Sequence, residues 1–239
     1  MYVEFIGQPG AGKSTVGGIL QREYSYYPSP DDDCIERWFR ARISSKWQPL
    51  NTAAWAIPSR LNALLFEDRV RCQAQQEFLS KHPEFLWLLT TIEGRDQEHT
   101  ASKIRSLISQ GADFQLKSVT VPDRRRLCIP QAFCHYAHPG HFPIEAYLDI
   151  VPIGDVVVFL DVPVEVALER QHQRGQVIGE LEGAKKAGFS DAQEYQEQAR
   201  ERNELVANLL SERTTVVQVD ATPPAEQVAE TVFEKLDEM

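Results

Sequence analysis

The sequence predicts an α/β fold with a parallel sheet, and three observations support that prediction. A glycine-rich loop stands between an apolar run and an amphipathic helical pattern near the start of the chain. The near-continuous apolar run Asp155–Val162 is typical of a strand that is covered on both faces. Thr214–Val219 has the composition of another strand, and a helix with Val228, Val232 and Leu236 at four-residue spacing follows it. Strands that alternate with helices favour a parallel sheet with right-handed crossovers.

A strand, a tight loop and a helix open the chain in that order. The apolar run Tyr2–Ile6 predicts the strand, and Val16, Ile19 and Leu20 share one face of the helix that follows. The segment between them fits G-x-x-x-x-G-K-[ST] at every fixed position, a pattern that binds phosphate in this context. The residues expected to bind the nucleotide are Gly7, Gln8, Pro9, Gly10, Ala11, Gly12, Lys13, Ser14 and Thr15.

The residue types in this loop suit a bound triphosphate. Glycines carry no side chain, so the loop can wrap with its backbone N–H groups pointing inward at an anion. The positive N-terminal end of the following helix adds to that attraction. We expect Lys13 to reach the β- and γ-phosphates of ATP and the Ser14 hydroxyl to complete a Mg²⁺ site. The strand and helix on either side disfavour the alternative, a chance glycine turn.

The composition suits one domain over residues 1–239 and narrows the classes of partner. Hydrophobic residues make up 42% and charged residues 25% of the chain, which is ordinary for a soluble globular protein. A formal net charge of −10 disfavours binding of nucleic acid or an anionic membrane by the surface as a whole. The four cysteines do not indicate a disulfide framework. A strand from residue 2 leaves no room for a signal peptide and no apolar run is of membrane-spanning length, so we expect a cytoplasmic protein.

The middle of the chain is expected to be mainly helical. Tyr24–Asp33 is rich in Tyr, Pro and Asp and can contain a short strand with its exit loop. Leu61–Leu79 predicts one helix, and a second is expected from about Gln97 to Ser109, ending before Gly111. Ser118–Val121 is predicted to be a short strand.

An acidic residue and three arginines follow that short segment. Asp123 closes the predicted strand Ser118–Val121, a position from which a carboxylate can hold Mg²⁺ through water. Of the arginines that come next, Arg124 is the one we expect to clamp an anionic acceptor or the transferring phosphoryl group. The alternative is a solvated turn.

A second pair of arginines follows the apolar strand Asp155–Val162. Arg170 and Arg174 are four residues apart, so both lie on one face of a helix. The glycine- and lysine-containing segment Gln176–Phe189 comes next, and a capping box at Ser190 predicts that helix resumes there. Two arginines on a segment that can close would neutralise charge on the transferring group and exclude water. The alternative is an exposed basic helix face.

Taken together, these motifs resemble those of the P-loop kinases of the thymidylate kinase and deoxynucleoside kinase group. The matching features, in order, are Gly7–Thr15, Asp123-Arg124, Arg170-x-x-x-Arg174 and the loop Asp220-Ala-Thr-Pro before the closing helix. The resemblance implies a three-layer sandwich with a parallel sheet of order 2-3-1-4-5. It also implies a helical acceptor-side region over residues 34–110, a lid over residues 170–198, and a loop after Val219 near the adenine.

The acceptor side departs from the pattern of that group. Pro28–Trp38 does not reproduce the usual acceptor motif, and Pro122 is unusual in a central strand. A carboxylate would orient an acceptor hydroxyl and take its proton. The acidic residues placed for this role are Asp31, Asp32, Asp33 and Glu36, of which Asp33 is preferred. A solvated acidic turn is the alternative.

The function these features favour is an ATP- and Mg²⁺-dependent small-molecule kinase. The residues expected to act in catalysis are Lys13, Arg124, Arg170, Arg174 and Asp33, with Ser14 and Asp123 at the metal. By resemblance, the acceptor is a nucleoside or nucleoside monophosphate, while a sugar or another metabolite stays open. A regulatory NTPase without a small-molecule acceptor is the other alternative. We expect no nucleic-acid or membrane partner, and a homodimer stays open.

Overall fold

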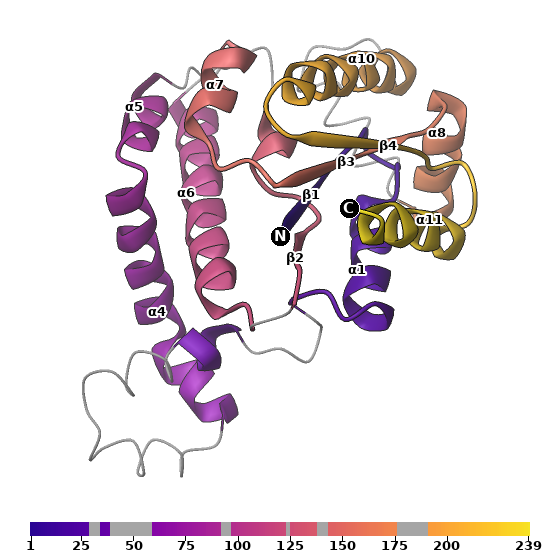
Figure 1. Cartoon of the computed structure of the whole chain (residues 1–239). Helices are drawn as coiled ribbons and strands as arrows, with labels where there is room; N and C mark the ends of the chain where they lie inside the picture. Colours follow the sequence, from indigo (N-terminus) through magenta and orange to yellow (C-terminus); the bar gives the residue numbers. More distant parts are fainter. Residues whose placement is uncertain (29–33, 39–58, 92–96, 123–124, 138–142, 176–190) are drawn as a thin grey trace. The chain divides into compact units, whose positions relative to one another are not determined.

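The computed structural model describes residues 1–28, 34–38, 59–91, 97–122, 125–137, 143–175 and 191–239 (Figure 1). These residues form two compact units. The first joins Met1–Tyr26 to Cys128–Met239, and the second comprises Tyr27–Leu127. In the ranges that the structure describes, no helix combines the length and apolar character needed to cross a membrane.

A parallel sheet lies at the centre of the first unit. Its strands are β1 (Tyr2–Ile6), β2 (Leu127–Ile129), β3 (Val156–Asp161) and β4 (Thr215–Asp220), in the spatial order β2-β1-β3-β4. β3 is parallel to both neighbours, so that Val156 pairs with Val3 on one side and with Thr215 on the other. Tyr27 forms an isolated parallel bridge with Leu127. The α/β prediction is confirmed. The four strands reproduce the 3-1-4-5 part of the expected order 2-3-1-4-5, and at the place of the second strand the described residues show this bridge alone.

Helices cover both faces of this sheet. α1 (Lys13–Glu23) and α11 (Ala225–Asp237) lie on one face and α10 (Ala192–Ser211) lies on the other (Figure 1). Side chains alternate along a strand, so Val3 and Phe5 join the core beneath α1 and α11, whereas Glu4 points to the opposite face. The shorter helices of this unit are η2 (Phe133–Tyr136), α7 (Ile144–Ile150) and α8 (Val164–Gln173).

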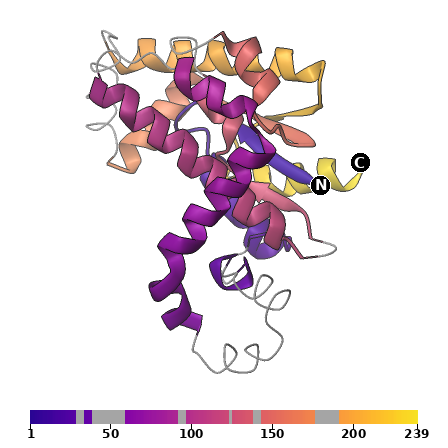
Figure 2. The same cartoon turned by 90° about the vertical axis from the view of Figure 1, so that its left-hand side faces the viewer.

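The second unit is helical. It contains a helical segment at residues 34–38, α4 (Ser59–Lys81), α5 (Glu84–Thr91) and α6 (Gln97–Thr120), and α4 packs against α6 (Figure 2). Trp38 packs with Val70 and Leu116 in its core. Arg71 Nη1 donates to Asp113 Oδ1 at 2.9 Å and ties α4 to α6 at their exposed side.

Two sequence-based predictions in this unit are wrong. The helix expected to stop before Gly111 continues to Thr120. A Cβ at Gly111 would lie 2.4 Å from the Phe78 ring of α4. This glycine therefore allows α6 to approach α4 instead of ending the helix. Ser118–Val121 is not a strand, since residues 118–120 form the last turn of α6. The strand of this region is β2, which has only three residues.

Other boundaries agree closely with the sequence. α4 and α11 cover the two helices predicted from apolar spacing, and β1, β3 and β4 lie where strands were expected. α10 begins at Ala192 with Asp191 as its N-cap, whose Oδ1 accepts from the Glu194 N–H at 2.8 Å. The predicted capping residue Ser190 lies outside the described residues.

Candidate nucleotide-binding site

The loop between β1 and α1 has the shape of a phosphate-binding loop. Gly10 has a φ of 85°, and a Cβ at this position would lie 2.6 Å from the Ala167 carbonyl oxygen of α8. A side chain there would be both strained and obstructed. Gly12 is the N-cap of α1 and makes no side-chain capping hydrogen bond. The first N–H groups of α1 therefore stay available to an anion.

Lys13 projects into this loop. Its side chain is buried, and its Nζ donates to the Gly7 carbonyl at 2.6 Å and to the Gln8 carbonyl at 3.0 Å. Burial and the nearby Arg202 guanidinium lower the pKa of Lys13 to about 7. Neutral carbonyls are its hydrogen-bond partners in the described part of the chain, so the ammonium keeps its capacity to neutralise a phosphate.

Ser14 lies beside the loop that follows β2. Its hydroxyl is exposed and accepts a hydrogen bond from Gln131 Nε2 at 3.2 Å. Gln131 was not singled out from the sequence, because a lone glutamine after a strand carries no signal of its own. Within the described ranges, no group of three or more His, Cys, Asp or Glu side chains lies close enough together to hold a metal ion. Of the two residues predicted to hold Mg²⁺, Ser14 and Asp123, only Ser14 lies within the described residues.

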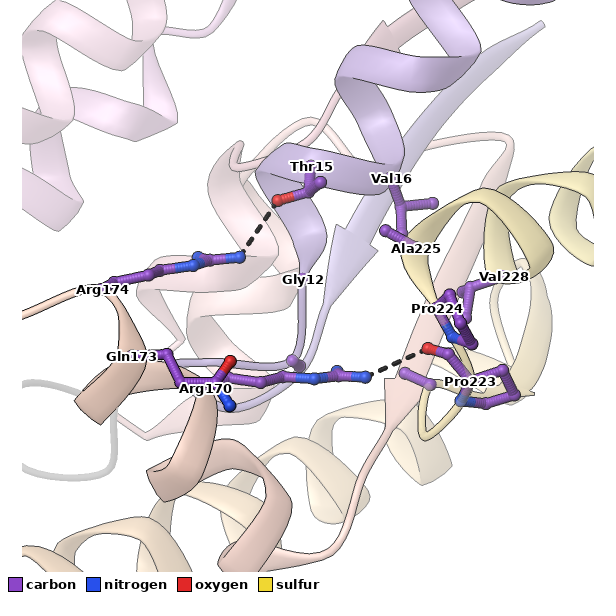
Figure 3. Close-up of a pocket in the computed structure, with 12 residues that line it drawn as sticks. Gly12, Thr15, Val16, Arg170, Gln173, Arg174, Pro223, Pro224, Ala225 and Val228 are labelled. Carbon is purple, nitrogen blue, oxygen red and sulfur yellow. Dashed lines mark hydrogen bonds between the residues drawn. The ribbon is translucent and has the colours of Figure 1, made fainter.

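A pocket of about 190 Å³ adjoins the phosphate-binding loop (Figure 3). Its walls include Thr15 and Val16 of α1, Arg170 of α8 with the C-cap residue Arg174, and Pro223 and Val228 from the segment after β4. These segments follow β1, β3 and β4, so the pocket lies outside the carboxyl ends of the strands, where parallel sheets bind ligands. Apolar side chains and two guanidinium groups form a lining that suits a flat aromatic base.

The two arginines of α8 share one helix face, as their spacing predicted, but they reach different parts of the pocket (Figure 3). Arg170 Nη2 donates to the carbonyls of Thr222 at 2.9 Å and Pro223 at 3.1 Å, on the loop after β4. Arg174 Nη2 donates to Thr15 Oγ1 at 3.3 Å, in the first turn of α1. Arg170 thus contacts the loop after β4, and Arg174 contacts the first turn of α1.

Several predicted site residues lie outside the described residues. They are Asp33, Asp123, Arg124 and most of the lid, residues 176–190. The argument for Asp123 and Arg124 was that they close a strand, and that argument fails because residues 118–120 belong to α6. Both residues precede β2 in the chain, and the residue that follows β2 and reaches the phosphate-binding loop is Gln131.

Comparison with known proteins gives a result at the level of the fold. No protein-family model and no curated protein sequence matches the chain. A solved structure of deoxyadenosine kinase from M. mycoides, with the products dCMP and a flexible dCDP bound, matches 100% of both chains at 15% identity with a TM-score of 0.52. Structures of that kinase with dCTP and with dATP match at 16% and 17% identity, with TM-scores of 0.42 and 0.39. The first match shows that this chain shares the fold of deoxyadenosine kinase, and it confirms at that level the resemblance drawn from the motifs.

Proposed function

We propose that the protein is a kinase that uses ATP and Mg²⁺ to phosphorylate a small acceptor, a nucleoside or a nucleoside monophosphate. The observation that carries the proposal is the buried Lys13 ammonium in a glycine loop, next to a pocket suited to a base. A pocket for a base beside a loop for phosphates matches the two ends of a nucleoside triphosphate.

Each part of the described site has a role in this proposal. The N–H groups at the start of α1 bind phosphate oxygens, and Lys13 neutralises their charge. The base enters the pocket between α8 and the loop after β4, with the Arg170 guanidinium stacked against its face. Arg174, beside Thr15, stabilises the charge of the transferring phosphoryl group. Mg²⁺, bound with the help of the Ser14 hydroxyl, would neutralise the triphosphate.

The acceptor class rests on two considerations. The structurally similar kinase binds dCMP and dCDP as products, which favours a nucleoside or nucleotide acceptor for this chain as well. A carboxylate must orient the acceptor hydroxyl and take its proton, and Asp33 keeps that proposed role. Positioning and charge supply most of the rate in such a transfer, so the protein needs little covalent chemistry of its own.

The test is ADP production from Mg-ATP across a panel of nucleosides, nucleoside monophosphates and sugars. We expect one acceptor class to stimulate ADP release strongly, and Lys13→Met, which keeps the aliphatic stem, to abolish that stimulation. A sugar as the best substrate would leave a kinase with a different acceptor. Slow hydrolysis that no acceptor changes would contradict the kinase and support a regulatory NTPase.

The same assay separates the two arginines. Arg170→Ala should raise the KM for ATP more than it lowers kcat, because Arg170 is placed against the base pocket. Arg174→Ala should lower kcat more than it raises KM, because its guanidinium lies beside the phosphate-binding loop. Equal effects of the two substitutions on both constants would refute the division of roles.

A further inference from the structure

A third arginine, Arg202 of α10, also lies near the phosphate-binding loop. It is partly buried, beside the buried Ala199 and Asn203, and its guanidinium is close enough to repel the Lys13 ammonium. In the part of the chain that the structure describes, Arg202 has no carboxylate partner and donates no hydrogen bond. Its electrostatic neighbours are Lys13 and the Tyr195 hydroxyl.

Arg200 on the same helix has the opposite environment. Its guanidinium contacts Asp161 Oδ1 at 3.1 Å and Glu204 Oε1 at 3.3 Å. Arg200 is thus paired with two carboxylates, whereas Arg202, two residues later, has no such pair among the described residues. Carboxylates therefore reach α10, and within the described ranges none of them pairs with Arg202.

The strand end explains how α10 comes close to Lys13. Arg200 binds Asp161, the last residue of β3, while Gln8 Nε2 donates to the carbonyl of the next residue, Val162, at 3.1 Å. Lys13 is in turn held by the Gln8 carbonyl at 3.0 Å. The phosphate-binding loop and α10 are therefore fastened to adjacent residues at the carboxyl end of one strand.

Two neighbouring cations without an anion are unfavourable in a buried place. Removal from water disfavours each charge, and mutual repulsion adds to the cost. Burial accordingly lowers the pKa of Arg202, and burial together with Arg202 lowers that of Lys13. A polyanion between them would reverse the balance, because a guanidinium can donate two parallel hydrogen bonds to phosphate oxygens.

We propose that Arg202 binds the phosphates of the bound nucleotide together with Lys13. The inference rests on the proposed function only in that the site takes a nucleoside triphosphate, and it needs no particular acceptor. Arg202 thus supplements Arg174, which approaches from α8, so that cations from α1, α8 and α10 surround the phosphates.

The direct test is binding of inorganic tripolyphosphate to the full-length protein by calorimetry. We expect Arg202→Gln to weaken binding about 10-fold or more, as loss of a charge-assisted contact to phosphate does, and Arg202→Lys to recover part of it. Arg200→Gln removes the same charge from the same helix, and it should weaken binding much less than Arg202→Gln does, because Arg200 only helps to position α10. Affinity of Arg202→Gln equal to that of the wild type would overturn the inference.

The melting temperature of the ligand-free protein distinguishes a phosphate-binding arginine from one that stabilises the fold. Arg202→Gln removes a cation that no described carboxylate pairs with, so the ligand-free protein should melt at the same or a higher temperature than the wild type. Arg200→Gln leaves Asp161 without its partner and should melt lower. A strong loss of stability in Arg202→Gln would assign Arg202 to structure and overturn the inference.

These outcomes separate the inference from the proposed function. If Lys13→Met loses tripolyphosphate binding and Arg202→Gln keeps it, the phosphate site stands and the role of Arg202 is refuted. If the wild-type protein binds neither tripolyphosphate nor Mg-ATP, both proposals fail.

Discussion

Glu4, in the middle of β1, offers a test of the electrostatics beneath the sheet. Its side chain is fully buried; Oε1 accepts from the Cys134 N–H at 2.6 Å, and Oε2 accepts from the Tyr2 hydroxyl at 3.2 Å. These hydrogen bonds favour the carboxylate, but burial outweighs them and raises the pKa of Glu4 to about 7. The group thus changes its charge near neutral pH.

The size of the effect follows from the two pKa values. Glu4 has a pKa of about 7 in the folded protein and 4.5 in the unfolded chain, a difference that corresponds to about 3 kcal/mol. The folded state holds the proton more tightly, so its stabilising contribution is fully present below pH 4.5 and is lost as pH rises through about 7. Between about pH 5.5 and about pH 8 the loss is about 2 kcal/mol.

Glu4→Gln should remove this dependence. Glutamine keeps a carbonyl oxygen for the Cys134 N–H but stays neutral at every pH. Urea denaturation at the two pH values should show the free energy of unfolding falling by about 2 kcal/mol more in the wild type than in the variant. Glu230→Gln, on the exposed side of α11, should behave like the wild type. If wild type and Glu4→Gln lost the same free energy of unfolding between the two pH values, burial would not control this carboxyl group.

Three further predictions concern the nucleotide site. Gly10→Ala should lower the free energy of unfolding in urea by about 1–3 kcal/mol, because residue 10 has a φ of 85° and the new Cβ would lie 2.6 Å from the Ala167 carbonyl oxygen. Gly18→Ala, within α1, is the control and should be neutral or stabilising. Equal losses in the two variants would refute the strain assigned to Gly10. Binding of Mg-ATP at pH 8 should take up a proton, because the phosphates raise the pKa of Lys13 from about 7. The affinity for Mg-ATP should therefore fall as pH rises above that value. Calorimetry in buffers of different ionisation enthalpy measures this proton uptake, and an uptake of zero would contradict the argument. Ala225→Phe should fill the pocket and weaken ATP binding while leaving tripolyphosphate binding unchanged; parallel losses for both ligands would show that the pocket does not hold the base.

The parts of the fold that the sequence predicts well are those whose cause is local. Gly7–Thr15 lies between β1 and α1 as expected, since the glycines and the flanking apolar residues that produce the loop all lie within a short stretch. β3 was recognisable because a strand covered on both faces is apolar along its whole length. Val228, Val232 and Leu236 in turn mark the buried face of α11.

The parts that were missed depend on residues distant in the chain. Gly111 is an ordinary helix-stop signal unless one knows that the Phe78 ring from α4 occupies the space beside it. β2 is too short to show a period and follows a run of arginines, so its three apolar residues gave no signal. Because the strand was predicted at Ser118–Val121 instead of Leu127–Ile129, Asp123 was selected as a strand-end residue although it precedes β2. Gln131 illustrates the same limit, because its position beside Ser14 depends on where β2 ends.

Arginines show most clearly what sequence spacing can and cannot supply. The spacing of Arg170 and Arg174 places them on one helix face, yet their hydrogen-bond partners lie on different walls of the pocket. Arg200 and Arg202 both look like members of a charged, solvated helix. The structure is needed to show that, among the described residues, carboxylates pair with Arg200 and not with Arg202. A buried cation whose partner is missing from the described protein is informative because folding alone does not compensate for it. The same reasoning applies to Lys13, and two such cations beside one glycine loop favour a polyanionic ligand more strongly than either does alone.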